Sequence, residues 1–68
     1  MYTFKVFKNN KELHPISHNK STSDKTIAYE IWDKMQLHYE HKSQLFGYSY
    51  SISMLKDNVE IQHLDYEY

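Results

Sequence analysis

Histidines are the residues of this chain with the most versatile chemistry, because imidazole binds metal ions and transfers protons near neutral pH. The five histidines are His14, His18, His38, His41 and His63. His38 and His41 are three residues apart in a segment of helical period, so their side chains can lie side by side. A zinc site would need further ligands from His14, His18 or Glu40. Because the spacing matches no closed zinc motif and cysteine is absent, we expect no bound metal.

Serines and acids are plentiful, but the motifs that would make them catalytic are missing. The chain has no Gly-x-Ser-x-Gly sequence and no glycine-rich phosphate loop, since Gly47 is its one glycine. Acids such as Glu30 and Asp33 lie on the polar side of a helical pattern, and 68 residues leave little volume for a substrate cleft. We therefore expect a protein that is not an enzyme and that binds no cofactor.

The composition is typical of a small folded domain. Hydrophobic residues make up 40% of the chain and aromatic residues 16%, too much for a disordered segment. We interpret residues 1–68 as a single domain. No apolar run approaches the ~20 residues that cross a bilayer, and the first residues do not resemble a signal peptide. Because the absence of cysteine fits a reducing compartment, we expect a cytoplasmic protein without membrane association.

The charges are unevenly distributed, although the formal net charge is only −1. Residues 1–26 carry five lysines and two acids, whereas residues 27–68 carry three lysines and seven acids. Arginine, which makes bidentate contacts to phosphate and guanine, is absent, so direct nucleic-acid binding is the weaker interpretation. Lysine without arginine, beside many Tyr, Asn and Ile, also suggests AT-rich coding DNA and an origin in a phage or a bacterial mobile element.

Residues 23–42 have the period of an amphipathic helix. Their apolar residues recur at spacings of three and four and are Ile27, Ala28, Ile31, Trp32, Met35 and Tyr39. We expect Ser21 or Ser23 to cap the start of this helix, with Asp24 in its first turn. Gly47 marks its end.

Two hairpins flank the predicted helix. Residues 2–8 alternate as a strand does, Asn9-Asn10 suits a two-residue turn, and residues 11–16 form the return strand. Pro15 restricts this return strand to a sheet edge.

The second hairpin begins with residues 46–55, the most regular strand pattern in the chain. Its apolar face carries Phe46, Tyr48, Tyr50, Ile52 and Met54, and its other face carries Gly47 and serines. Asp57-Asn58 suits a second two-residue turn, and a bulge near residues 62–63 would keep the last strand in phase. The expected pairs are then Ile61 with Met54, Leu64 with Ile52, Tyr66 with Tyr50 and Tyr68 with Tyr48.

The order ββαββ predicts an α+β fold of two layers, with one helix packed on a four-stranded antiparallel sheet. We expect the strand order 2-1-3-4, with the Pro15 strand at an edge. The aromatic face of the third strand should lie beneath the helix, and the serine face should lie in water.

Because we expect neither catalysis nor metal binding, we expect the protein to act by binding a partner through its exposed side chains. Residues 60–68 combine acids with tyrosines, a composition suited to contact with a basic surface, and acids also follow the outer side of the helix. The expected protein-binding residues are Glu30, Asp33, Leu37, Glu40, Asp65, Tyr66 and Glu67.

Our main hypothesis is a small non-catalytic protein-binding module, an inhibitor or adaptor that blocks a basic groove of a larger host protein or nucleoprotein. An anti-defence protein, including an anti-CRISPR, is one version of this hypothesis. The first alternative is a single-stranded nucleic-acid-binding protein that uses the sheet and N-terminal lysines. These lysines are Lys5, Lys8, Lys11 and Lys20. The second alternative is a self-associating structural protein, because a homodimer would add stability to a small core.

Overall fold

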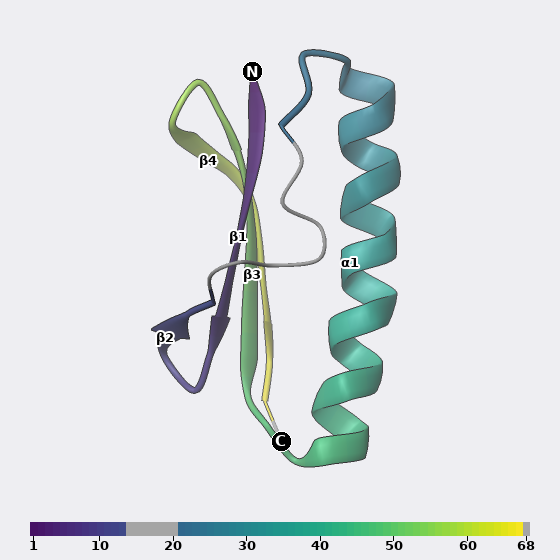
Figure 1. The fold of residues 1–68 in the computed structure, drawn as a ribbon, viewed down its shortest axis with the longest axis vertical. Coiled ribbons are helices and arrows are strands. Elements are labelled where there is room, and N and C mark those ends of the chain that lie inside the picture. Colours follow the sequence, from purple (N-terminus) through teal and green to yellow (C-terminus); the bar gives the residue numbers. More distant parts are fainter. Residues whose placement is uncertain (14–20, 68) are drawn as a thin grey trace.

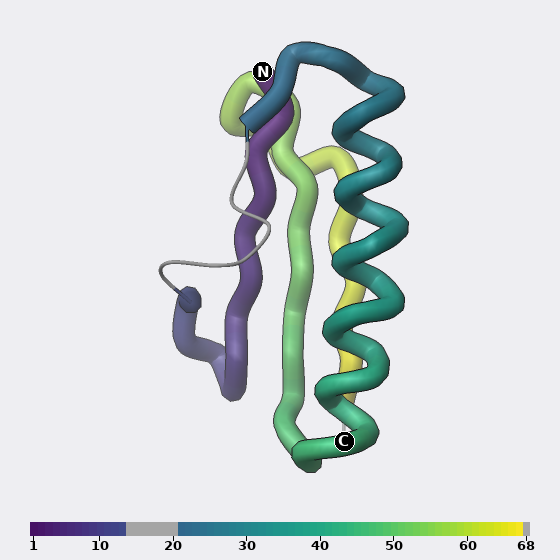
Figure 2. The backbone as a smooth tube through the Cα atoms, turned by 45° about the vertical axis from the view of Figure 1, so that its right-hand side comes forward, coloured from purple at the N-terminus to yellow at the C-terminus, as the bar shows by residue number. Residues whose placement is uncertain are grey.

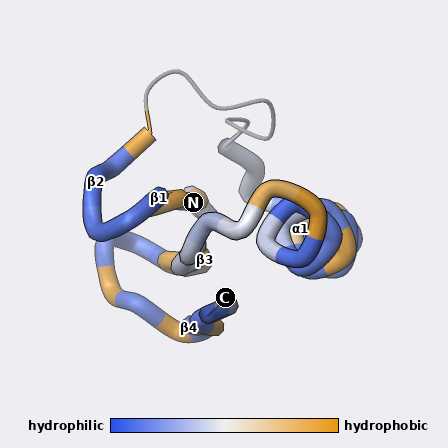
Figure 3. The backbone as a smooth tube through the Cα atoms, turned by 90° about the horizontal axis from the view of Figure 1, so that it is seen from below, coloured by the Kyte–Doolittle hydropathy of each residue, from blue (hydrophilic) through white to orange (hydrophobic). Residues whose placement is uncertain are grey.

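The computed structural model describes residues 1–13 and 21–67, which form one helix and four strands in two layers (Figure 1). The elements are β1 (Tyr2–Lys8), β2 (Lys11–Glu12), α1 (Lys25–Phe46), β3 (Tyr50–Lys56) and β4 (Val59–Tyr66). The sheet is antiparallel with the order β2-β1-β3-β4, and α1 covers one of its faces (Figure 3). The predicted α+β fold and strand order are confirmed.

Helix α1 begins slightly later than predicted, because its N-cap is Asp24. The Oδ1 atom of Asp24 accepts hydrogen bonds from the backbone N–H of Thr26 at 2.8 Å and of Ile27 at 3.4 Å. The expectation that Ser21 or Ser23 would cap the helix is therefore wrong. An aspartate at this position satisfies two N–H donors that the first turn of a helix leaves without an internal partner.

Gly47 ends α1, as predicted. Its φ of 71° lies in the left-handed region, and its N–H donates to the Ser43 carbonyl at 3.0 Å. Because no residue of the last turn breaks a helix, α1 continues through Phe46, and the prediction that Phe46 begins a strand is wrong. Strand β3 consequently starts only at Tyr50.

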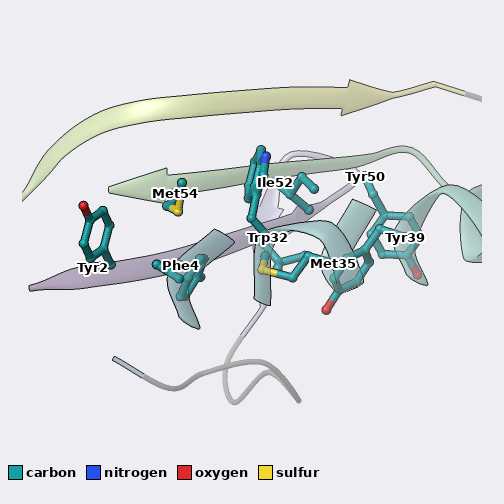
Figure 4. Packing of buried hydrophobic residues seen from close by; sticks show 10 residues of the cluster. Tyr2, Phe4, Trp32, Met35, Tyr39, Tyr50, Ile52 and Met54 are labelled. Carbon is teal, nitrogen blue, oxygen red and sulfur yellow. The ribbon is translucent and has the colours of Figure 1, made fainter. Parts of the chain in front are cut away.

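The core lies between α1 and the central strands (Figure 4). Its buried residues are Tyr2, Phe4, Val6, Ala28, Trp32, Met35, Tyr39, Tyr50, Ile52 and Met54. Full burial of one such large side chain contributes roughly 1.5–3 kcal/mol. Ile27, expected in the core, is 46% exposed. Consecutive helical residues point about 100° apart, and Ala28 rather than Ile27 takes the position that faces the sheet.

The apolar face of the third strand is buried only in part. Tyr50 lies beneath α1 as predicted, and its ring packs 5.2 Å from that of Tyr39, centroid to centroid. Tyr48 and Phe46 are exposed, so the prediction that these two side chains lie under the helix is wrong. Both precede β3 and therefore do not follow its alternation.

The bulge in β4 lies slightly earlier than predicted. Met54 pairs with Gln62 and Leu55 with Glu60, which leaves Ile61 as the extra residue. The predicted pairing of Ile61 with Met54 is therefore wrong. Beyond the bulge the predicted register is confirmed, with Leu64 opposite Ile52 and Tyr66 opposite Tyr50.

Both predicted two-residue turns are present. Asn9 and Asn10 have φ values of 50° and 70°, and Asp57 and Asn58 have values of 51° and 68°. Asparagine and aspartate tolerate this left-handed backbone better than most residues, which is why the sequence locates these turns correctly.

The first return strand is described only at its start. β2 is Lys11–Glu12, and the next residue, Leu13, donates its N–H to the Val6 carbonyl at 2.8 Å. The rest of the strand predicted over residues 11–16 and the predicted pairing of Tyr68 with Tyr48 lie outside the described residues.

The face of the sheet opposite α1 is polar, but water does not reach all of it. Ser53 is only 4% exposed, so the expectation that the serines of this face lie in water is wrong for this residue. Ser53 pairs with Lys5 of β1 on one side and with His63 of β4 on the other. The His63 imidazole lies 2.9 Å from Ser53 Oγ and covers one side of the serine.

Candidate protein-binding surface

Four of the seven expected binding residues lie together at one end of the molecule. They line a hollow of about 240 Å³ between the last turns of α1 and the end of β4, and the lining residues are Glu40, Ser43, Gln44, Asp65, Tyr66 and Glu67. Figure 2 shows the end of β4, in yellow, beside the end of α1. We call this set of residues the acidic hollow.

The electrostatics of the acidic hollow keep its tyrosine neutral and its aspartate charged. Burial raises the pKa of the Tyr66 hydroxyl, and the nearby Glu40 carboxylate raises it further. Asp65 accepts a hydrogen bond from the Ser51 hydroxyl at 2.6 Å and is contacted by His63 Nε2 at 2.9 Å. These two hydrogen bonds lower the pKa of Asp65. The hollow therefore offers the Tyr66 hydroxyl beside the Glu40 carboxylate, while the Asp65 carboxylate is directed to the open face of the sheet.

The other three expected residues, Glu30, Asp33 and Leu37, lie on the outer side of α1 and are exposed. Together with Glu40 they are spaced by three or four residues, which places all four on one side of the helix. They extend the acidic character of the hollow along α1. Leu37, 71% exposed, is an apolar residue within this polar surface.

An exposed aromatic patch adjoins the acidic hollow. Gln44 lines the hollow, and the next two residues, Leu45 and Phe46, are exposed. The Phe46 ring stacks on that of Tyr48 with centroids 6.2 Å apart, and Lys8 Nζ lies 3.8 Å from the centroid of the Tyr48 ring. The lysine thus makes a cation–π contact that holds Tyr48 at the surface.

Sequence reasoning missed a polar network on the open face of the sheet. His63 Nδ1 lies 2.9 Å from Ser53 Oγ and 3.1 Å from Glu60 Oε1, while Nε2 contacts Asp65. A hydrogen bond from Ser53 is the main cause that lowers the pKa of Glu60. The signal was the alternation of His63 and Asp65 opposite serines. The predicted bulge near residues 62–63 left the direction of the His63 side chain open, because a bulged residue departs from the alternation of the strand.

This network contains the residue types of a hydrolytic triad, but its geometry fits a structural role. A nucleophilic serine must be accessible to substrate and must lie near N–H donors that stabilise an oxyanion. Ser53 is buried in the middle of β3, where the backbone is engaged in the sheet. The network therefore joins β3 to β4 through side chains.

The histidines do not assemble a metal centre within the described residues. Residues 1–13 and 21–67 contain no group of three or more His, Asp or Glu side chains placed to hold a metal ion. Burial lowers the pKa of His38, as do the nearby Lys42 and His41. The metal ligands considered at His14 and His18 lie outside the described residues.

Comparison with known proteins adds no assignment. A scan against protein-family models, a search of curated proteins and a search of solved structures each give no match to this chain. Within the part of the chain that the structure describes, no helix has both the length and the apolar character required to span a membrane.

Proposed function

We propose that this protein is a small, non-catalytic protein-binding module that docks an acidic, tyrosine-bearing surface onto a basic surface of a larger protein and blocks it. One observation carries this proposal. Glu40 of α1 lies beside Tyr66 at the end of β4 and Glu67, the residue that follows this strand, although the two segments are far apart in the sequence.

The chemistry of this surface suits a basic partner. The carboxylates of the acidic hollow attract lysine and arginine side chains and accelerate the encounter. Tyr66 and the neighbouring Phe46 and Tyr48 supply rigid aromatic contact area, and tyrosine is among the residues that contribute most to binding energy at interfaces. A chain of 68 residues seated on a groove would act by steric occlusion.

Within this class, we favour an inhibitor or adaptor from a phage or mobile element, with an anti-defence role as one version. The small size and an amino-acid composition with lysine but no arginine support this origin. The open face of the sheet, where the nucleic-acid alternative places its bases, carries Glu60 and Asp65. These carboxylates would repel a phosphate backbone, so the acidic surface favours a protein partner.

The proposal is tested by retention of a partner from a candidate host lysate on immobilised protein. Glu40→Gln combined with Glu67→Gln removes two charges from the acidic hollow. Because each exposed ion pair contributes ~0.2–1 kcal/mol, we expect retention to fall roughly 2- to 30-fold. The matched control, Glu12→Gln with Asp57→Asn, makes the same change in net charge elsewhere and should retain the partner. Equal retention by both variants, or no retained protein, would contradict the proposal.

A further inference from the structure

The outer edge of β4 is an open sheet edge. β4 is the last strand in the sheet order, and no other described strand pairs with its outer side. Proteins usually block such an edge with lysine, proline or a bulge. The strand Val59–Tyr66 contains neither lysine nor proline, and its bulge at Ile61 lies near the turn. The regular part that follows the bulge is therefore available for pairing.

The alternation of an antiparallel ladder identifies the backbone groups at this edge. Leu13 donates its N–H to the Val6 carbonyl, so Val6 directs its backbone groups toward β2. Its partner Ile52 then directs its backbone groups away from β1, toward Leu64 of β4. It follows that the residues on either side of Leu64 direct their N–H and C=O groups to the outer edge. These residues are His63 and Asp65.

The side chains around the edge indicate what chemistry would pair with it. On the open face the edge carries Asp65 and Glu60. On the face toward α1 the edge carries Leu64, which is 37% exposed. The acidic hollow, with Glu40 and Glu67, lies next to it at the end of β4. An extended segment along this edge would thus meet carboxylates on both faces of the sheet and one apolar contact between them.

We infer that β4 takes up, as an additional strand, an extended segment of the partner protein that carries lysine or arginine side chains. Backbone hydrogen bonds to His63 and Asp65 supply affinity, and the carboxylates select basic side chains. A second copy of this chain suits the edge less well, because β4 carries acids and no lysine, so two copies would bring like charges together. The inference rests on the proposed function and specifies its binding mode.

The probe is a synthetic peptide of alternating lysine and valine, with two controls. In one control glutamate replaces each lysine, and in the other two central residues are proline, which prevents strand pairing. Affinity at low salt is measured by fluorescence anisotropy, and amide hydrogen exchange by NMR. We expect only the lysine–valine peptide to bind. At saturation it should slow exchange of the His63 and Asp65 amides at least tenfold and leave that of Leu64, already bonded to β3, nearly unchanged.

A pair of variants separates the backbone from the side chain. His63→Pro removes an outward N–H together with the imidazole, whereas His63→Ala removes the imidazole alone. We expect at least a tenfold loss of peptide affinity for His63→Pro and a change within twofold for His63→Ala. Slow exchange of the Ile52 amide in both variants verifies that the sheet is intact, and the exchange experiment on the unaltered protein does not depend on either variant.

Three outcomes would overturn the inference. The first is absence of peptide binding at low salt. The second is binding without protection of the His63 and Asp65 amides, which means contact through charge alone. The third is concentration-dependent protection of these amides in the free protein, which means that a second copy occupies the edge. Failure of the proposed function is a separate result. It would be seen if removing the charges of the acidic hollow left the retention of the partner unchanged.

Discussion

The two hairpins of this protein start from nearly the same turn and end differently. Asn9-Asn10 and Asp57-Asn58 adopt the same left-handed backbone, yet β2 has two residues and β4 has eight. The turn fixes the register of each hairpin, and the described pairing extends to Leu13 after the first turn and through Tyr66 after the second. The two hairpins therefore leave two very different edges on one sheet.

The edge beside β1 is closed at both ends, while the edge of β4 is open. Thr22 pairs with Tyr2 at the start of β1 through backbone hydrogen bonds of 2.7 and 3.2 Å, and β2 covers the other end. Along β4 the described residues provide no such cover. Among the described residues, the edge of β4 is therefore the longer uncovered edge, and it is also the side that carries the acidic hollow.

The largest expected loss of stability comes from a substitution at the centre of the sheet, and it should exceed the loss from the same kind of substitution at this open edge. Val6, Ile52 and Leu64 form one row across β1, β3 and β4, and the first two are fully buried. Ile52→Ala should lower the free energy of unfolding by about 2–5 kcal/mol, because it leaves a cavity in the core. Leu64→Ala should lower it by only about 1 kcal/mol, since that side chain is partly exposed. Urea unfolding followed by circular dichroism measures both, and equal losses would show that β4 is as well packed as β3.

A smaller loss of stability is expected from substitution of Asp24, the N-cap that follows the edge residue Thr22 and begins α1. Asp24→Ala removes the acceptor of two hydrogen bonds from the first turn of α1 and should lower the free energy of unfolding by about 1 kcal/mol. Ser23→Ala is the matched control, because the sequence favoured that serine as the cap and the structure does not use it. The same urea experiment compares them. A larger loss for Ser23→Ala than for Asp24→Ala would contradict this assignment.

The sequence was sufficient for the fold because its strongest signals are local. Turn residues with positive φ, an apolar stripe at helical spacing and Gly47 determine the elements, and two layers with the order β2-β1-β3-β4 follow from them. Element boundaries were harder to predict. Asp24 and Ser23 are both good caps, and nothing in the sequence shows which of them meets the free N–H groups.

The candidate surface was less accessible to sequence reasoning, because it depends on contacts between distant segments. Period alone places Glu40 on the outer side of α1 but cannot place it beside Tyr66. The direction of the His63 side chain was open, because the bulge was predicted near residues 62–63 and lies at Ile61. An error of one residue in a strand exchanges its faces, whereas the same error in a helix rotates a side chain by only about 100°.

The smallest effect concerns the one difference between the two turns. Asp57→Asn makes the second turn identical to Asn9-Asn10, so the backbone conformation should be kept. The variant loses only the ion pair between Asp57 and the N-terminal ammonium of Met1, whose nitrogen lies 2.8 Å from Oδ1. The hydrogen bond from this ammonium is the main cause that lowers the pKa of Asp57 below its ordinary value of 3.8.

A lowered carboxyl pKa stabilises the folded state above the ordinary pKa, and this contribution disappears as the pH falls through the lowered value. The original chain should therefore be slightly more stable than Asp57→Asn at neutral pH and equally stable in strong acid. Both groups are exposed, so the difference should also shrink with added salt. The urea concentrations at the midpoint of unfolding, determined for both chains at neutral pH and in strong acid, measure this difference in stability. Acetylation of the N-terminus is the control, because it should lower the stability of the original chain at neutral pH and leave Asp57→Asn unchanged. If acetylation affects both chains equally, the ion pair between Asp57 and the N-terminal ammonium does not contribute to the stability of the second turn.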